Sequence, residues 1–327
     1  MAECKPKSFP GMSRRMFCRS AIAAAILCAA KSPAQPSDTN PKFKFYKTLS
    51  PGPIGVKADQ RQALDYAVKY GFAGIAPEYG EFEKASSDSI LKWVDEMKQK
   101  GIRYGSAGLP VQFRADEDAF KKDMALLPQR AQLLNRMGVT RIATWLSPGH
   151  NTLTYLQNFQ QHKTRLRPVA AILGDSGIRL GLEFVGPKTS RARSRFGFIA
   201  TQAEMMELID AIAANNVGLL LDSWHWYTSH GTADELLRLS NDNIVQVHVN
   251  DAPAGIPVDQ QVDNRRALPT TTGVIDLKSF INTLVKIGYD GPVECEPFDQ
   301  ELNQLENDAA LEKTAESLNR LWALMTP

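Results

Sequence analysis

The feature that most constrains the fold of this chain is a strand–helix alternation that repeats eight times after Pro41. Each unit opens with a short apolar run and continues into an amphipathic stretch, for example FAGIAPE (72–78) followed by SSDSILKWVDEMKQKG (86–101). Regular alternation of this kind predicts a parallel sheet with helical crossovers. Eight units predict an α/β protein with a single domain, a closed (β/α)8 or TIM barrel over residues 41–327.

A doubly wound open sheet is the alternative architecture. It usually needs fewer strands, and its dinucleotide-binding form carries a G-x-G-x-x-G fingerprint after the first strand. This chain has SPGPIG (50–55) at that place instead. Within the expected helices over 115–138 and 152–177, Pro128 and Pro168 predict a kink or a break.

Residues 1–34 are predicted to be an export signal outside the barrel. SRRMFCR (13–19) precedes an apolar stretch, SAIAAAILCAA (20–30), and the Arg14–Arg15 pair resembles a twin-arginine signal peptide with cleavage after Ala34. The alternatives are an uncleaved membrane anchor and a lipoprotein attached through Cys28. The sequence therefore predicts a periplasmic or otherwise exported protein with no stable membrane anchor after cleavage.

Removal of this segment changes the charge of the protein. It contains six basic residues and one acidic residue, so the formal net charge falls from +2 to −3. A mildly acidic chain is a poor candidate for nucleic-acid binding. Three of the four cysteines also lie in the segment, which leaves Cys295 and allows no internal disulfide.

Polar residues gather at the carboxyl ends of the expected strands, where barrels of this kind place their active sites. The fifth to eighth strands present Glu183, Asp222, His248 and Glu296 in succession. Three carboxylates that share a small volume repel one another unless a cation compensates them. Oxygen ligands with one imidazole suit a divalent metal ion such as manganese, magnesium, cobalt or zinc.

Single members of this set have simpler explanations. Asp222 alone is typical of a helix cap, and His248 alone is typical of a hydrogen-bonded structural residue. On the eighth strand Glu294 and Glu296 have the same parity and compete for the role of ligand. Glu296 lies nearer the carboxyl rim and is the predicted ligand, whereas Glu294 is expected to lie one layer deeper or to pair with a basic group.

Four segments carry a resemblance to a known family, the xylose isomerase-like family of sugar isomerases and epimerases, which also contains the type IV apurinic endonucleases. They are LEFVGP, DSWHWY, HVND and ECEPF, at the fifth to eighth strands. The chain most resembles the ketose 3-epimerase and inosose-processing branch. The resemblance implies a metal ion held by Glu183, Asp222, His248 and Glu296, and it implies that His225 touches substrate oxygens.

The resemblance also implies that Glu183 and Glu296 are the catalytic acid/base pair. A metal ion that chelates a carbonyl oxygen and the adjacent hydroxyl of a sugar stabilises the enediolate formed when the α-proton leaves. Removal of the proton on one face and its return on the other inverts the carbon.

Other residues are predicted to bind the substrate. They are Glu78 and Trp145 at the second and fourth strands, Asp251 after the seventh, and Arg265, with Arg266 as its alternative, in the long loop 252–269. The basic loop KTSRARSRFG (188–197) is either a lid for an acidic or phosphorylated substrate or a solvated loop.

The sequence thus predicts a metal-dependent sugar isomerase or epimerase with a small carbohydrate substrate. The alternatives are a lyase or dehydratase that acts on a keto-sugar or 3-keto-glycoside, an endonuclease and a sugar-binding barrel without chemistry. Five histidines and the acidic charge disfavour the endonuclease. Manganese is the predicted ion, because twin-arginine export moves folded proteins and allows metal uptake before zinc competes. The sequence is also compatible with a homo-oligomer.

Overall fold

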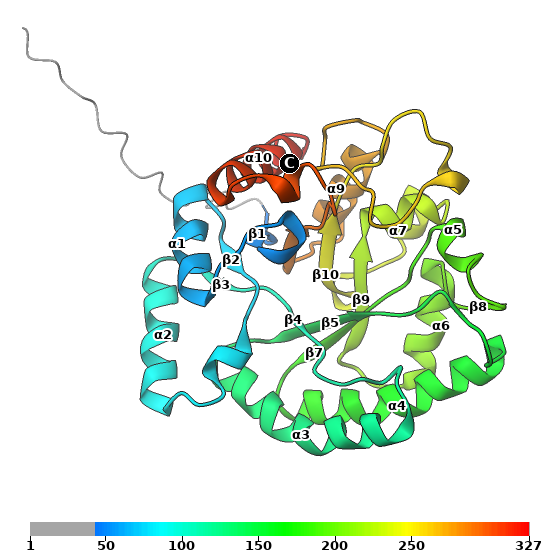
Figure 1. The fold of residues 1–327 in the computed structure, drawn as a ribbon, viewed down its shortest axis with the longest axis horizontal. Coiled ribbons are helices and arrows are strands. Elements are labelled where there is room, and N and C mark those ends of the chain that lie inside the picture. Colours follow the sequence, from blue (N-terminus) through cyan, green and yellow to red (C-terminus); the bar gives the residue numbers. More distant parts are fainter. Residues whose placement is uncertain (1–42, 327) are drawn as a thin grey trace, which may run out of the picture. The chain divides into compact units, whose positions relative to one another are not determined.

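A computed structural model describes residues 43–326, and the predicted export segment lies outside the described residues. Nine parallel strands form one sheet, in the order β3-β2-β1-β11-β10-β9-β7-β5-β4 (Figure 1). The strands are β1 Tyr46–Leu49, β2 Gly74–Ile75, β3 Arg103–Tyr104, β4 Ala107–Gly108, β5 Arg141–Trp145, β7 Arg179–Glu183, β9 Val217–Asp222, β10 Ile244–Val249 and β11 Pro292–Cys295.

The sheet closes on itself through its third strand. The two end strands, β3 and β4, are halves of one segment, 103–108, and are separated only by Gly105 and Ser106. The first half pairs with β2 and the second half pairs with β5. Neighbours in the sheet therefore follow the order of the chain, which is the arrangement of a barrel and not of a doubly wound sheet.

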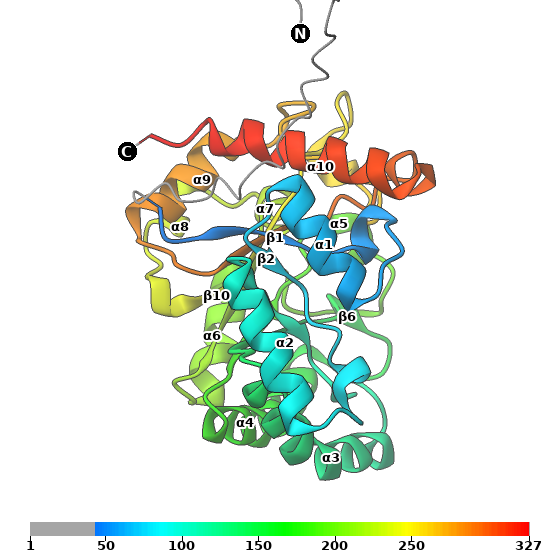
Figure 2. The ribbon, with the colours of Figure 1, turned by 90° about the vertical axis from the view of Figure 1, so that its left-hand side faces the viewer.

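Helices surround the strands (Figures 1 and 2). Consecutive helices contact one another from α3 to α4 to α6 and from α8 to α9 to α10, and α10 packs on α1. This ring confirms the predicted (β/α)8 architecture. The helices that follow the strands are α1 Gln60–Tyr70, α2 Ser87–Gln99, α3 Glu117–Arg136, α4 Tyr155–Asp175, α6 Gln202–Ile212, α8 Ala233–Leu236, α9 Leu277–Lys286 and α10 Asn307–Trp322.

The helix starts follow their sequence signals. Asp59, Ser86, Asp116, Thr154 and Thr201 cap α1, α2, α3, α4 and α6, each by accepting a backbone N–H with its side chain. No helix among residues 43–326 is both long and apolar enough to cross a bilayer.

The breaks expected at the two prolines do not occur. Both α3 and α4 are continuous through Pro128 and Pro168. Each helix buries an apolar face against the barrel, and this packing outweighs the one backbone hydrogen bond that a proline removes.

The strands are buried on both faces, as expected for a parallel sheet covered by helices. Every residue of β9 and β10 is buried. Most of these residues are aliphatic, and the polar ones are Asp222, Gln246 and His248. Because burial of a polar group is costly without a partner, these three residues mark the part of the barrel where function is to be sought.

The sixth unit differs from its prediction. The sequence pattern favours a strand over 217–227, but β9 ends at Asp222 and a short helix, α7 Ser223–Thr228, follows. The Asp222 side chain accepts the backbone N–H of Trp224 at 2.8 Å and so turns the chain. The carboxylate therefore does cap a helix, and it does so while facing the barrel axis.

Candidate metal centre

Four side chains converge at the carboxyl ends of β7, β9, β10 and β11. Glu183, Asp222, His248 and Glu296 each offer one potential ligand atom, and these four atoms lie within 4.8 Å of one another. Strand register explains the convergence, because His248 is paired with Asp222 on β9 and the strands of the four residues are adjacent. The structure brings together all four residues that the sequence singled out.

Unsatisfied atoms show that this group fits a cation. Glu183 Oε1 and His248 Nδ1 are buried and have no hydrogen-bond partner, although they lie only 3.7 Å apart. His248 Nδ1 is also 3.2 Å from Glu296 Oε2. A buried oxygen and nitrogen left without partners are a liability in a stable fold. Three carboxylates and one imidazole form a donor set that suits a divalent ion.

The electrostatics of the group reflect its crowding. Burial, with Glu296 nearby, holds the pKa of Glu183 well above its ordinary value. Burial alone would lower the pKa of His248, but Glu296 and Glu183 outweigh it and raise this pKa to about 10. The raised pKa of Glu183 removes negative charge from the group, and the raised pKa of His248 adds positive charge. A bound cation would compensate the carboxylates in the same way.

Arg266 is the second compensating charge in the centre. Its Nη1 lies 2.7 Å from Asp222 Oδ2 and 3.0 Å from Glu296 Oε2. The neighbouring Arg265 is exposed. The prediction that Arg265 reaches the site is therefore wrong, and its alternative, Arg266, takes that place. The loop 252–269 is irregular, so the alternation of inward and outward side chains that holds in a strand does not apply to it. The sequence pattern therefore cannot tell which of the two arginines points inward.

A cavity of about 460 Å³ opens above the cluster. Its walls include Glu183, Glu296, Arg266 and two of the predicted substrate-binding residues, His225 and Trp145. The His225 ring is buried, which lowers its pKa to about 4, and its Nδ1 accepts the backbone N–H of Gly186 at 3.2 Å. The Trp145 side chain is 48% exposed, and Arg114 stacks on its ring at 4.3 Å.

Two further predicted residues lie outside this cavity. Asp251 is fully buried, and its carboxylate fixes a loop by accepting the backbone N–H groups of Ala252, Thr272, Gly273, Val274 and Ile275. Glu78 is exposed beyond the end of β2 and is not part of the cavity wall. Strand-end position alone does not tell a loop-organising carboxylate from one that points at the axis.

On the eighth strand, Glu294 and Glu296 lie at different depths in the barrel. Glu296 belongs to the group of four, whereas Glu294 lies on the other edge of the His248 ring, with its Oε2 3.8 Å from Nε2. Glu294 is thus one layer deeper, as predicted. Burial raises its pKa to about 7.

Two groups that shape the site have no role in the sequence prediction: Asn250 stands among the polar residues at the end of the seventh strand without an assigned task, and Phe298 is not singled out. Asn250 donates to Asp222 Oδ1 at 3.0 Å and accepts the backbone N–H of Glu296 at 3.1 Å, so it links two members of the cluster. Phe298 adopts φ +43° and packs on the Arg266 guanidinium at 4.8 Å. An Asn after HV in HVND was a signal for the first, and no sequence signal marks the second.

The basic loop contributes to the cavity wall. Its residues Ser190, Arg193 and Ser194 line the cavity. It is tied to the loop that carries Arg266, because Lys188 pairs with Asp259 at 3.0 Å and Thr189 donates to the Gln261 carbonyl at 2.7 Å.

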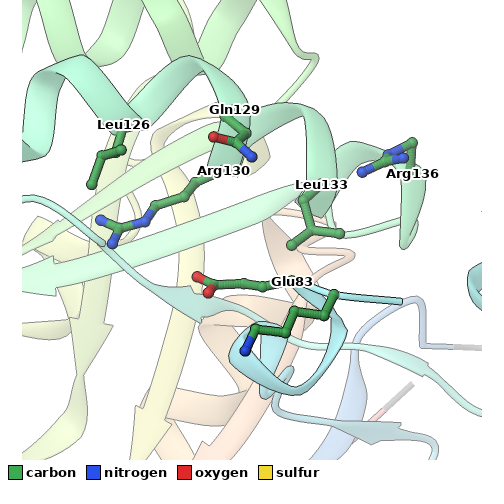
Figure 3. Close-up of a pocket in the computed structure, with 7 residues that line it drawn as sticks. Glu83, Leu126, Gln129, Arg130, Leu133 and Arg136 are labelled. Carbon is green, nitrogen blue, oxygen red and sulfur yellow. The ribbon is translucent and has the colours of Figure 1, made fainter. Parts of the chain in front are cut away.

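Another hollow, of about 250 Å³, lies away from the strand ends, between α3 and the turn after β2 (Figure 3). Leu126, Leu133 and three cationic side chains contribute to its wall, with one carboxylate, Glu83. Its single carboxylate does not make a set of metal ligands.

The fold is a closed (β/α)8 barrel, and four of its neighbouring strands bring three carboxylates and a histidine together. These two features place the chain among α/β barrels that carry a set of metal-ligand residues at their strand ends. The sequence matches the xylose isomerase-like TIM barrel family over residues 64–321, and the chain belongs to that family.

Individual relatives include isomerases and epimerases. The chain is 28% identical to the inosose isomerase of Halalkalibacterium halodurans over 151 residues, which are 46% of this chain and 50% of that protein. It is 24% identical to the L-ribulose 3-epimerase of Mesorhizobium japonicum over 67% of this chain and 68% of that one. The match spans about half the length of the inosose isomerase.

Solved structures share the fold. A xylose isomerase domain protein from Alicyclobacillus acidocaldarius has a TM-score of 0.76 at 29% identity, over 86% of this chain and 99% of that one. The IOLI protein, whose crystal structure holds a zinc atom, has a TM-score of 0.70 at 18% identity, over 85% and 98% of the two chains.

Proposed function

We propose that this protein is a divalent-metal-dependent isomerase or epimerase of sugars that moves a proton next to a carbonyl group. One observation carries the proposal. Glu183 on β7 and Glu296 after β11 stand at the two ends of a row of four ligand-type residues on adjacent strands, and both line the same cavity.

The residues of the chain have separate tasks in this reaction. Glu183, Asp222, His248 and Glu296 would hold the ion, which supplies Lewis acidity to a sugar carbonyl when bound. One of the two glutamates takes the proton from the carbon next to the carbonyl, and the same or the other one returns it. Return by the other glutamate, on the opposite face, inverts that carbon.

The cavity supplies orientation and restricts water. His225 is neutral at physiological pH, since burial lowers its pKa to about 4, and its Nε2 edge faces the cavity beside Arg266. It is therefore suited to hydrogen-bond a sugar hydroxyl without adding charge. Trp145 and Phe298 both line the cavity, and their aromatic rings favour contact with the C–H face of a sugar ring.

Relatives support the reaction class. One relative is an inosose isomerase and another is an L-ribulose 3-epimerase. The IOLI protein, which has the same fold, holds a zinc atom in its crystal structure. For this chain we propose manganese as the resident ion, because a protein that folds before export takes up its metal before zinc competes for the site.

The test is hydrogen exchange in heavy water. The protein without residues 1–34 is incubated with Mn²⁺ and a panel of ketoses and 3-keto-glycosides, and the carbon next to the carbonyl is followed by NMR. Deuterium is expected there for the accepted substrate. Glu183→Gln and Glu296→Gln are each expected to lower the rate by 10²–10⁴-fold, the usual contribution of a positioned acid or base.

The products distinguish the proposal from its alternative. A lyase or dehydratase begins with the same proton abstraction and then expels a β-substituent, so it yields an eliminated fragment and no epimer. Exchange without elimination supports the isomerase. Bound metal with no exchange into any sugar of the panel would contradict both.

We also propose that the protein is exported by the twin-arginine route and acts on a small carbohydrate outside the cytoplasm. The support is the segment 1–34, in which the Arg14–Arg15 pair precedes an apolar stretch and small residues. Replacement of both arginines by lysine is expected to leave the full-length precursor in the cytoplasm. Export of this variant at the normal level would contradict the route.

A further inference from the structure

The basic loop 188–197 is a fixed wall of the cavity above the proposed metal centre. Two contacts tie its start to the loop 252–269, as described above. Its end forms a short strand, β8 Phe196–Gly197, which pairs antiparallel with β6 Gly149–His150. Because the loop is held at both ends, the side chains that it places on the cavity wall have defined positions.

One cation on this wall has no partner. Arg193 is exposed and lines the cavity, and its guanidinium forms no hydrogen bond or ion pair within residues 43–326. Other cations of the loop are engaged elsewhere: Lys188 pairs with Asp259, and Arg195 lies over the Phe196 ring at 5.0 Å. Arg193 is therefore available to a ligand in the cavity.

The carboxylates of the cavity do not neutralise Arg193. Asp263 and Glu296 both pair with Arg266, at 2.9 and 3.0 Å. Glu183 belongs to the group of four proposed metal ligands. None of these three carboxylates forms an ion pair with Arg193, so the wall made by the loop carries a positive charge that its neighbours leave uncompensated.

Three uncharged polar side chains, those of Ser190, Ser194 and Asn264, also line the cavity. In the part of the chain that the structure describes, none of these side chains makes a hydrogen bond. Both serines lie close to Arg193, because its backbone N–H donates to the Ser190 carbonyl at 3.3 Å and Ser194 is the next residue. The loop thus presents two hydroxyl groups beside an unpaired guanidinium.

This combination suits an oxyanion. A guanidinium presents its N–H donors in one plane, which matches two oxygens of a carboxylate or a phosphate. Hydroxyl groups can donate to the remaining oxygen lone pairs. A neutral sugar hydroxyl would leave the charge of Arg193 uncompensated, whereas an anionic group pairs with it.

We propose that Arg193, Ser190 and Ser194 form a subsite for an anionic group of the sugar substrate, a carboxylate or a phosphate. This inference rests on the proposed function, because it concerns the substrate of the same cavity. It makes Arg193 a specificity-determining residue that touches the end of the substrate remote from the reacting carbon.

The test uses three ketoses that differ only at the carbon farthest from the ketone. D-Fructose carries a hydroxymethyl group there, D-fructuronate a carboxylate and D-fructose 6-phosphate a phosphate ester. Titration calorimetry measures the binding of each to the Mn²⁺-loaded protein. We expect at least one charged ketose to bind about tenfold more tightly than fructose, and the tighter of the two identifies the group.

Matched variants of the loop assign this preference to one side chain. Arg193→Met is expected to abolish it while leaving the affinity for fructose unchanged. Arg193→Lys keeps the charge without the planar donors and should retain part of the preference. Arg195→Met, two positions away and outside the cavity wall, removes the same charge from the loop and should bind all three ketoses like the wild type.

The outcomes separate this inference from the proposed function. Equal affinity of the wild type for the three ketoses, failure to bind either charged one, or an equal loss in the two methionine variants would overturn the subsite. Deuterium exchange into any of these sugars would still support the isomerase in that case. Conversely, tight binding that depends on Arg193, without deuterium uptake next to the carbonyl, would support the subsite and contradict the isomerase.

Discussion

At the scale of the residue, Arg266 compensates the negative charge of the centre when no ion is bound. Its guanidinium is buried and contacts both Asp222 and Glu296, so the metal-free protein relies on it to compensate two carboxylates. Removal of one partner from a buried ion pair costs about 3–5 kcal/mol, because it leaves an uncompensated charge.

Arg266→Met is therefore expected to lower the free energy of unfolding by about 3–5 kcal/mol in chelator. Saturating Mn²⁺ should restore part of this loss, because the ion takes over the compensation of the carboxylates. Urea unfolding with and without Mn²⁺ measures both effects, and Arg265→Met, at the exposed neighbouring position, is the matched control. Equal stability of the two variants in chelator would show that Arg266 does not compensate the centre.

At the scale of the element, α4 carries a buried histidine, His162, away from the site. Burial lowers the pKa of His162 to about 4, and its Nδ1 is 2.9 Å from the Asn158 carbonyl one turn earlier. Phe113 and Phe198 pack on the ring. The unfolded chain binds a proton at His162 below about pH 6.5, whereas the folded chain does so only near pH 4. Stability is therefore lost as the pH falls from 6.5 towards 4.

His162→Leu is expected to weaken this pH dependence. Between pH 7 and pH 5 the wild type should lose about 2 kcal/mol more of its unfolding free energy than the variant does. Urea unfolding at the two pH values gives the difference within each protein, so the direct cost of the substitution cancels. An identical loss in the two proteins would mean that His162 is already protonated in the fold at pH 5.

At the scale of the whole molecule, the sequence predicts the barrel and its four converging side chains well, because both follow from regular features. Strand order in a barrel repeats chain order, and strand parity tells which side chains face inward, so Glu183, Asp222 and His248 could be placed together without coordinates. Helix caps such as Thr154 follow equally local rules.

The parts that could not be predicted depend on contacts between distant loops. Arg266 rather than Arg265 faces the centre because of the path of an irregular loop. The Asp251 carboxylate accepts hydrogen bonds from five backbone amides, and most of these amides belong to a segment some twenty residues later in the chain. The continuity of α3 through Pro128 is set by packing on the barrel, which local propensity does not contain.

The most direct test of the account is the number of metal ions that the chain binds. The protein is freed of metal by chelator, titrated with Mn²⁺, and its bound metal is counted by mass spectrometry, beside Asp222→Ala and His248→Ala. The account predicts one ion per chain in the wild type and none retained in either variant. A wild type that binds no ion, or variants that bind it equally well, would show that Glu183, Asp222, His248 and Glu296 do not form a metal centre.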